Sequence, residues 1–355
     1  MIQKISSVSL EEFKRGEGSS CFVVGDFMDE GILDDWKRKA MRHNRELLQK
    51  VYDDPNNSTI LLPPGVILFS PGKRRYRRKD LYFDPVICLH SARSAVVFQG
   101  SGHGVGGTFL LVYTGENGSK YGSDMFYFND YMEGRGPNYL QGVTFCDFVI
   151  DGKYSDTEKY TSAGKGFMLN LCRDCHWNHV VVRNTIGTGF GMDCLIDCSI
   201  KNCIAENCGR GIYQLGKYQE GKYDQCFGGS GFGIGTGYSC LECAVIKNCI
   251  SIGNAKYGFF FEHQKRFGKK NDLGEDLYPA ETTLGYSVLN CRASGNLYGF
   301  GVEYGDHVCF QDSVSEGSFL EDIHLVGDLF CVSFSNMIPP FESSIPSSNT
   351  YCKKF

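Results

Sequence analysis

A glycine followed by alternating apolar side chains recurs along the second half of the chain, and no other feature constrains the fold as strongly. The repeats begin at Gly166, Gly189, Gly211, Gly231, Gly258 and Gly299, so that successive glycines lie 23, 22, 20, 27 and 41 residues apart. Repeats of this length are typical of solenoids, in which each unit packs against its neighbours. We therefore expect stacked coils, the last of which carries a long loop.

The residues after each glycine should form continuous ladders, because successive side chains of a strand point to opposite faces. The first residue after the glycine is aromatic in five repeats and apolar in all: Phe167, Phe190, Ile212, Phe232, Phe259 and Phe300. The third residue is apolar in five repeats, Leu169, Met192, Ile234, Phe261 and Val302, and is Gln214 in the remaining one. These positions predict an all-β fold, a parallel β-helix whose coils stack the ladders in its interior.

A second register supports the same fold. The segments IKNCIAEN, IKNCISIGN and VLNCRASGN align Asn202, Asn248 and Asn290, and each asparagine is followed by a cysteine. Asparagine suits the tight left-handed turns between strands. We therefore interpret most of the 17 cysteines as reduced, buried ladder residues rather than as bridges or metal ligands.

The first sixty residues predict a cap for the open end of the solenoid. The spacing of apolar residues predicts a helix from about Asp34 to Tyr52, and STILLPPGVILF reads as two strands joined by a Pro-Gly bend. A solenoid needs such an element to cover its terminal core. We expect an N-terminal segment over 1–60, a β-helix over 61–332 and a Pro/Ser-rich tail over 333–355.

The N-terminal segment resembles the cap of the right-handed parallel β-helix superfamily that includes pectate lyases and polygalacturonases. The caps of that superfamily commonly read DFGA-GDG-TDD and then YLPPG. The matching residues here are Asp26, Phe27, Gly31, Asp34 and Asp35, followed by Leu62, Pro63, Pro64 and Gly65. The resemblance implies a right-handed parallel β-helix with an N-terminal capping helix.

The outward positions, two and four residues after each glycine, suggest a saccharide-binding groove. They hold several glycines, the aromatic residues Tyr213 and Phe260, and the carboxylates Asp193, Glu262 and Glu303. Glycines leave room for a ligand, aromatic rings stack on sugars, and carboxylates perform acid–base chemistry. The alternative is that these are ordinary solvated side chains on the outside of a solenoid.

Within this groove, Glu262 and Glu303 should lie on neighbouring coils about 5 Å apart. Two like charges so placed raise the pKa of one carboxyl group, which would provide an acid and a base. His263 and Tyr304 follow the two glutamates and are candidate proton carriers or sugar contacts. Lys265 and Arg266 would attract an anionic polysaccharide to the edge of the groove.

The segment GTGFGMD also resembles the GYGFD motif of mannuronan C5-epimerase catalytic modules, which share the β-helix fold. Gly189, Gly191 and Asp193 match that motif, whereas Phe190 replaces its tyrosine and Leu195 stands where the family has a histidine. The resemblance implies proton removal beside a uronate carboxyl group, with Asp193 as the retained acid–base residue.

Two functions are compatible with these patterns. The first is an enzyme that processes an anionic, uronic-acid polysaccharide by lyase, epimerase or hydrolase chemistry. The second is a non-catalytic saccharide-binding protein, such as a phage tail-spike-like adhesin, which could form a trimer; otherwise the oligomeric state stays open. We expect no metal site from the motifs, but the resemblance to β-helix lyases, which often use calcium, implies that the stacked acids could hold this ion.

Composition limits the partners further. A formal net charge of -5 argues against an extended nucleic-acid surface, and no run of about 18 apolar residues is present to cross a membrane. The N-terminus lacks the apolar block of a secretory signal. We therefore expect a protein that is cytoplasmic as synthesised and is released by lysis or carried on a virion.

Overall fold

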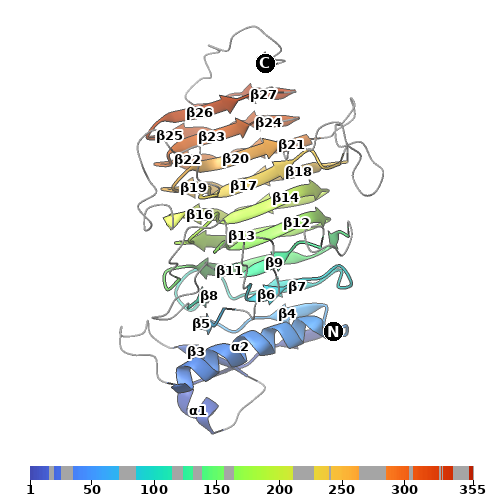
Figure 1. The fold of residues 1–355 in the computed structure, drawn as a ribbon, viewed down its shortest axis with the longest axis vertical. Coiled ribbons are helices and arrows are strands. Elements are labelled where there is room, and N and C mark those ends of the chain that lie inside the picture. Colours follow the sequence, from blue (N-terminus) through green and yellow to red (C-terminus); the bar gives the residue numbers. More distant parts are fainter. Residues whose placement is uncertain are drawn as a thin grey trace, which may run out of the picture.

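The computed structural model shows a right-handed parallel β-helix capped by one long helix (Figure 1). The structure describes residues 1–15, 20–24, 35–71, 85–113, 123–130, 138–155, 164–210, 228–239, 241–263, 285–303, 307–327, 329, 331–338 and 352–354. No helix among these residues has the length and apolar character needed to cross a membrane.

The strands form two long sheets that run along the solenoid. The sheet that carries the predicted groove has nine strands: β6 (Ile87–Cys88), β9 (Phe126–Phe128), β10 (Leu140–Gln141), β12 (Phe167–Arg173), β14 (Phe190–Ile196), β17 (Phe232–Thr236), β20 (Tyr257–His263), β23 (Tyr298–Glu303) and β26 (Glu321–Val326). All described pairings in this sheet are parallel.

The second sheet has nineteen strands and forms the other walls of the solenoid. Its strands are β1 (Ile2–Lys4), β2 (Ser7–Val8), β3 (Cys21–Val24), β4 (Thr59–Leu61), β5 (Gly65–Phe69), β7 (Val97–Gln99), β8 (Thr108–Val112), β11 (Thr144–Asp151), β13 (His176–Arg183), β15 (Cys198–Lys201), β16 (Ile204–Glu206), β18 (Cys243–Lys247), β19 (Ile250–Ile252), β21 (Gly285–Leu289), β22 (Arg292–Ser294), β24 (Val308–Gln311), β25 (Val314–Glu316), β27 (Val332–Ser335) and β28 (Cys352–Lys354).

The predicted phenylalanine ladder is confirmed at the centre of the core. Phe167, Phe190, Phe232, Phe259 and Phe300 occupy one register across β12, β14, β17, β20 and β23. Their rings stack with centroids 5.4, 4.6, 4.8 and 5.2 Å apart, and each is at most 1% exposed. Stacked, fully buried rings bury a large apolar area, so this ladder is a main source of stability.

The coil predicted to begin at Gly211 is wrong. Phe190 pairs directly with Phe232, so no strand lies between β14 and β17 in the nine-stranded sheet. Residues 211–227 lie outside the described part of the chain. The glycines Gly189 and Gly231 therefore belong to consecutive coils, and the spacing of about twenty residues on either side of Gly211 does not mark a coil of its own.

The asparagine ladder is also confirmed. Asn202, Asn248 and Asn290 have φ of 55°, 56° and 50°, the left-handed region that their short polar side chains tolerate. The amide of Asn202 donates to Asn178 over 2.9 Å, and that of Asn290 donates to Asn248 over 2.9 Å. Cys203, Cys249 and Cys291, which follow the three asparagines, are buried as thiols within the core.

The cap is the helix α2 (Asp35–Asp53), which lies across the lower end of the solenoid in Figure 1, beside the short helix α1 (Leu10–Lys14). Leu48 and Tyr52 of α2 are buried in the main core. This confirms the predicted helix within one residue at each end.

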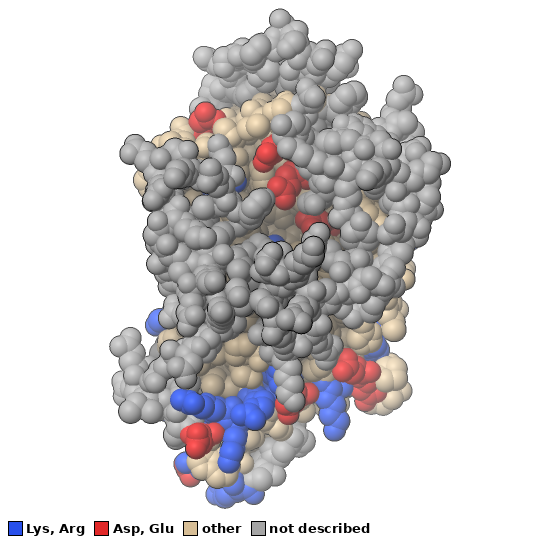
Figure 2. Space-filling model, in the orientation of Figure 1, with Lys and Arg blue, Asp and Glu red and all other residues tan. Residues whose placement is uncertain are grey.

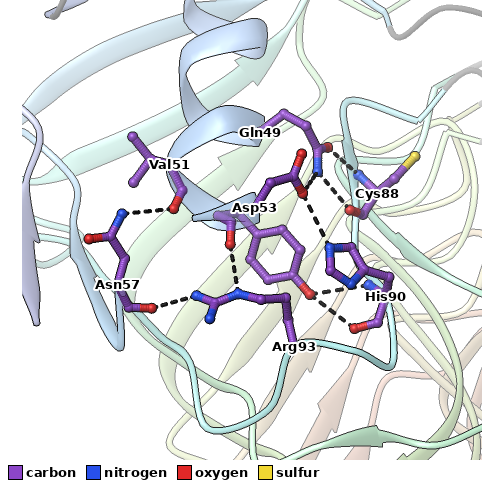
Figure 3. Close-up of polar contacts among 8 residues, drawn as sticks. Gln49, Val51, Asp53, Asn57, Cys88, His90 and Arg93 are labelled. Atoms are coloured by element: carbon purple, nitrogen blue, oxygen red, sulfur yellow. Dashed lines mark hydrogen bonds and ion pairs between the residues drawn. The ribbon is translucent and has the colours of Figure 1, made fainter. Parts of the chain in front are cut away.

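Hydrogen bonds fasten the end of α2 to the first coil (Figure 3). The amide of Gln49 both donates to the carbonyl of Cys88 and accepts from its N–H, each over 2.9 Å. Arg93 donates to the Tyr52 carbonyl over 2.8 Å, and the Tyr52 hydroxyl donates to the His90 carbonyl over 3.3 Å. These bonds satisfy backbone groups that would otherwise be buried without partners.

The sheets extend beyond the expected limits of the β-helix at both ends. At the N-terminus, β1 pairs in parallel with β4. At the C-terminus, β27 continues the ladder to Ser335, and Phe334 stacks on Phe310 with centroids 5.0 Å apart. The chain beyond residue 332 therefore still adds strands to the second sheet: β27, with its buried Phe334, and β28, which pairs with β27.

Candidate functional site

The three predicted carboxylates lie in one outward ladder of the nine-stranded sheet. Asp193 on β14 and Glu262 on β20 flank Gly235 on β17, and Glu303 on β23 pairs with Glu262. Asn170 on β12 continues the same ladder next to Asp193. Figure 2 shows acidic side chains on the upper part of the front face, where β14, β20 and β23 lie in Figure 1. The expected neighbouring positions of Glu262 and Glu303 are therefore confirmed.

Among the carboxyl groups of the outward ladder, Glu262 has a raised pKa. Its side chain reaches solvent, but the protein packed around it removes part of its hydration. This desolvation, together with the negative charges of Asp193 and Glu303, raises its pKa to about 7, and Lys165 and Lys256 partly oppose the change. Glu262 is therefore present in both protonation states near neutral pH, as an acid–base group requires.

Neutralising Glu303 should lower the pKa of Glu262, because one of the charges that disfavour ionisation would be lost. An NMR titration of the Glu262 carboxyl carbon is expected to give a midpoint near 7 in the wild type and a lower one in E303Q. Glu316→Gln, on the opposite sheet, is the matched control and should leave the midpoint unchanged. A wild-type midpoint at the ordinary glutamate value would refute the raised pKa.

The same shift makes stability depend on pH. Between the ordinary value of 4.5 and about 7, the native carboxyl group binds more protons than the unfolded chain does. The free energy of unfolding contributed by Glu262 therefore falls as the pH rises through this window. E262Q should lack this part of the pH dependence.

Two lysines border the carboxylates. Lys165 lies over Gly191, where an added Cβ would be 2.9 Å from the lysine Cδ, so glycine leaves the space that this side chain occupies. The backbone N–H of Lys165 donates to the carboxylate of the buried Asp124 over 2.7 Å. Desolvation raises the pKa of the Asp124 carboxyl group to about 6. Lys256 lies 5.4 Å from the Tyr257 ring centroid.

Several polar groups on this face lack the partners that protein groups normally find. The ammonium of Lys165 has one hydrogen-bond partner among the described residues, the weakly accepting sulfur of Met168 at 3.1 Å. No described residue donates a hydrogen bond to the carboxylate oxygens of Glu262 or Glu303, and the buried Oδ1 of Asn170 has no partner. Buried polar atoms are usually paired, so the unpaired Oδ1 of Asn170 stands out on this face.

Phe260 points outward as predicted, but it is only 8% exposed. The ring of Tyr257 stacks on it, with centroids 4.2 Å apart and planes 6° apart. The expectation of an exposed aromatic surface at this position is therefore wrong, whereas a role for Phe260 in sugar binding stays a prediction. Gly301 is required beside this stack, since an added Cβ would lie 2.4 Å from the Tyr257 ring.

Three residues that the repeat pattern did not single out flank the ladder: Tyr257, Tyr298 and His324. Tyr298 stacks on Tyr257 at 4.8 Å, and His324 lies 4.2 Å from Tyr298 and bonds Glu321 over 2.6 Å. Both tyrosines directly precede a repeat glycine, in YGFFF and YGFGV, as Lys165 does in KGF. The position directly before each repeat glycine could therefore have identified Lys165, Tyr257 and Tyr298 as neighbours of the ladder.

The remaining candidates cannot be placed. Tyr213, Tyr304, Lys265 and Arg266 lie outside the described residues, as does the side chain of His263. Their proposed contacts stay predictions. Phe190 and Leu195, which stand where the epimerase motif has its tyrosine and histidine, are fully buried in the core, so neither side chain is on the outward face.

The described residues include no group of three or more His, Cys, Asp or Glu side chains placed to hold a metal ion. Asp193, Glu262 and Glu303 do not form such a group. Cys172 and Cys175 belong to the buried core.

The fold and this surface define a parallel β-helix protein with an acidic ladder on one sheet. No protein-family model matches the sequence, and no curated protein sequence matches it. The chain is similar in structure to the A-module of mannuronan C-5 epimerase AlgE4 of Azotobacter vinelandii, with a TM-score of 0.50 and 16% identity over 89% of this chain and 75% of that one.

Two further solved structures are similar over most of this chain. The A-module of mannuronan C-5 epimerase AlgE6 of the same organism has a TM-score of 0.48 and 15% identity, over 93% of this chain and 79% of that one. ORF18 of Geobacillus virus E2 has a TM-score of 0.47 and 14% identity, over 98% of this chain and 60% of that one. At 16% identity, the likeness to the AlgE4 module shows a common fold and nothing about activity.

Proposed function

We propose that the protein processes an anionic, uronic-acid polysaccharide by acid–base chemistry on the outward face of the nine-stranded sheet. The observation that carries this proposal is the placement of Glu262 beside Glu303, with a pKa raised to about 7 and two lysines at its border. The similarity to an epimerase module that acts on mannuronan supports the same class of substrate.

Proton removal beside a uronate carboxyl group needs two things from a protein. A cation must neutralise the substrate carboxylate, since otherwise the carbanion would carry excess negative charge. A base must also accept the proton at neutral pH. Lys165 and Lys256 would supply the positive charge, and ionised Glu262 would be the base, with Asp193 or Glu303 as a further acid–base group.

The same pair of carboxyl groups suits hydrolysis. In glycosidases one carboxylic acid protonates the leaving oxygen while a second carboxylate acts as nucleophile or base. Protonated Glu262 would be the acid and Glu303 the carboxylate. Lyase, epimerase and hydrolase chemistry therefore need the same two residues with different starting protonation states.

One incubation separates these reactions. The protein is mixed in heavy water with alginate or with polygalacturonate, and three products are followed. Ultraviolet absorbance of an unsaturated uronate indicates a lyase, deuterium incorporated at intact residues indicates an epimerase, and new saturated reducing ends indicate a hydrolase. Binding without any of these products would refute the enzyme and favour the adhesin-like alternative.

Replacing Lys165 by glutamine should weaken the interaction with a polyuronate. Loss of a charged hydrogen bond to a carboxylate is expected to lower kcat/KM about tenfold. Lys201→Gln is the matched control, because Lys201 is an exposed lysine on the opposite sheet. Equal activities of K165Q and K201Q would remove Lys165 from the site.

A further inference from the structure

The outward face of the nine-stranded sheet continues past the acidic ladder to a second cluster. Leu171, Cys194 and Tyr238 are buried together there, with Tyr139 packed against them. Arg173 lies on this cluster, its guanidinium carbon 4.5 Å from the Tyr139 ring centroid. We call this group the Arg173 cluster.

Among the residues that the structure describes, Arg173 has no counter-charge. Its Nε atom is buried and has no hydrogen-bond partner, and no described carboxylate forms an ion pair with the guanidinium. By contrast, Arg183 bonds Asp151 over 2.7 Å, and Arg292 pairs with Glu316. A partly buried, unpaired guanidinium is costly to keep, whereas its planar fork matches a carboxylate.

The position of Arg173 relates it to the candidate site. Asn170, with its unpaired Oδ1, is in the acidic ladder on β12, and Arg173 ends the same strand. Lys165 bonds Met168 near the opposite end of β12. Arg173 lies five positions after Met168 on the same strand, a rise of roughly 16 Å that the left-handed residue Leu171 shortens somewhat.

Lys165 and Arg173 therefore lie on opposite sides of the acidic ladder, at a separation that exceeds one sugar ring. A polysaccharide that followed the solenoid axis would run along the ladder and leave Arg173 aside. One that followed the strands would cross the ladder once and meet both cations. Only on the second path could the polymer hydrogen-bond both the Oδ1 of Asn170 and the guanidinium of Arg173.

We propose that Arg173, stacked on Tyr139, binds a second carboxylate of the polyuronate, and that the polymer crosses the acidic ladder along β12 and β14. This inference rests on the proposed function and adds the direction of the polymer and a second anionic subsite. Arg173 is a substrate-binding residue and takes no part in proton transfer.

The test measures affinity against chain length. Wild type, R173Q and R292Q are titrated calorimetrically with disaccharides and octasaccharides of alginate and of polygalacturonate. R173Q is expected to bind octasaccharides about tenfold more weakly than wild type, the loss expected for one charged hydrogen bond, while disaccharide binding at the Lys165 end is unchanged. R292Q removes an equal charge from the opposite sheet and should match wild type with every ligand. Unchanged thermal unfolding of R173Q would show that its fold is intact.

Different failures identify different errors. If wild type binds octasaccharides and R173Q binds them equally well, the Arg173 subsite is refuted and the proposed function stands. If R173Q loses affinity for disaccharides and octasaccharides alike, Arg173 belongs to the central site and the crossing path is refuted. If wild type binds no acidic oligosaccharide, both proposals fall.

Discussion

Replacing Glu262 by glutamine is expected to reduce turnover of a polyuronate by about 10²–10⁴-fold, the usual contribution of a positioned acid–base group. Glutamine keeps the size of the side chain but can neither give up nor accept a proton at neutral pH. Affinity for the polysaccharide should remain close to that of wild type, because binding is assigned to Lys165 and Arg173. The measurement is kcat from product formation together with Kd from calorimetry on the same samples.

Glu206→Gln provides the matched control for this change. Glu206 is an exposed glutamate on β16 of the opposite sheet, so its loss removes the same charge from the protein without altering the ladder. E206Q should retain wild-type kcat. If E262Q also retains it, then Glu262 is a solvated carboxylate whose raised pKa serves no reaction, and the acid–base proposal is wrong.

The raised pKa also has a consequence for stability that supports a functional interpretation. Desolvation and two nearby carboxylates disfavour ionised Glu262, so the native protein is less stable at pH 8 than it would be with a neutral side chain. E262Q should therefore unfold at a higher temperature than wild type at pH 8. Such a gain in stability with a loss of turnover is typical of residues kept for chemistry.

The ladders were predictable from the sequence because their cause is local. A strand alternates its side chains, and stacked coils bring equivalent positions together, so the spacing of Phe232 and Phe259 already implies contact. The asparagine turns follow for the same reason, since Asn248 tolerates the left-handed conformation that the turn requires. By the same logic, the sequence alone predicts that Glu262 lies beside Glu303, as the pairing of β20 with β23 confirms.

The features that the sequence did not reveal depend on packing between residues that no repeat aligns. The direct pairing of β14 with β17 could not be anticipated, because Gly211 begins a segment that imitates a coil. The burial of Phe260 depends on the rotamer of Tyr257, three residues earlier, which period-two alternation does not specify. Lys165 reaches the site only because Gly191, on the next coil, leaves it room.

Truncating Phe232 to alanine should produce the largest loss of stability of any single change considered, about 3–5 kcal/mol. Phe232 is fully buried and stacks on Phe190 at 4.6 Å and on Phe259 at 4.8 Å, so its removal opens a cavity between two rings. In a solenoid each coil is held by its neighbours, and a weak central coil separates the stack into two parts. Chemical unfolding of F232A should therefore begin at lower denaturant and extend over a broader range than that of wild type.

The contrasting variant is Phe319→Ala, because Phe319 is 77% exposed near the C-terminal end of the solenoid. The same atoms are removed in both variants, but F319A creates no cavity and should change the free energy of unfolding by less than about 0.5 kcal/mol. A difference of this size between two identical substitutions can come only from burial in the ladder. If F232A and F319A unfolded alike, the ring stack would contribute little, and the strand hydrogen bonds of the parallel sheets would have to account for the stability of the β-helix.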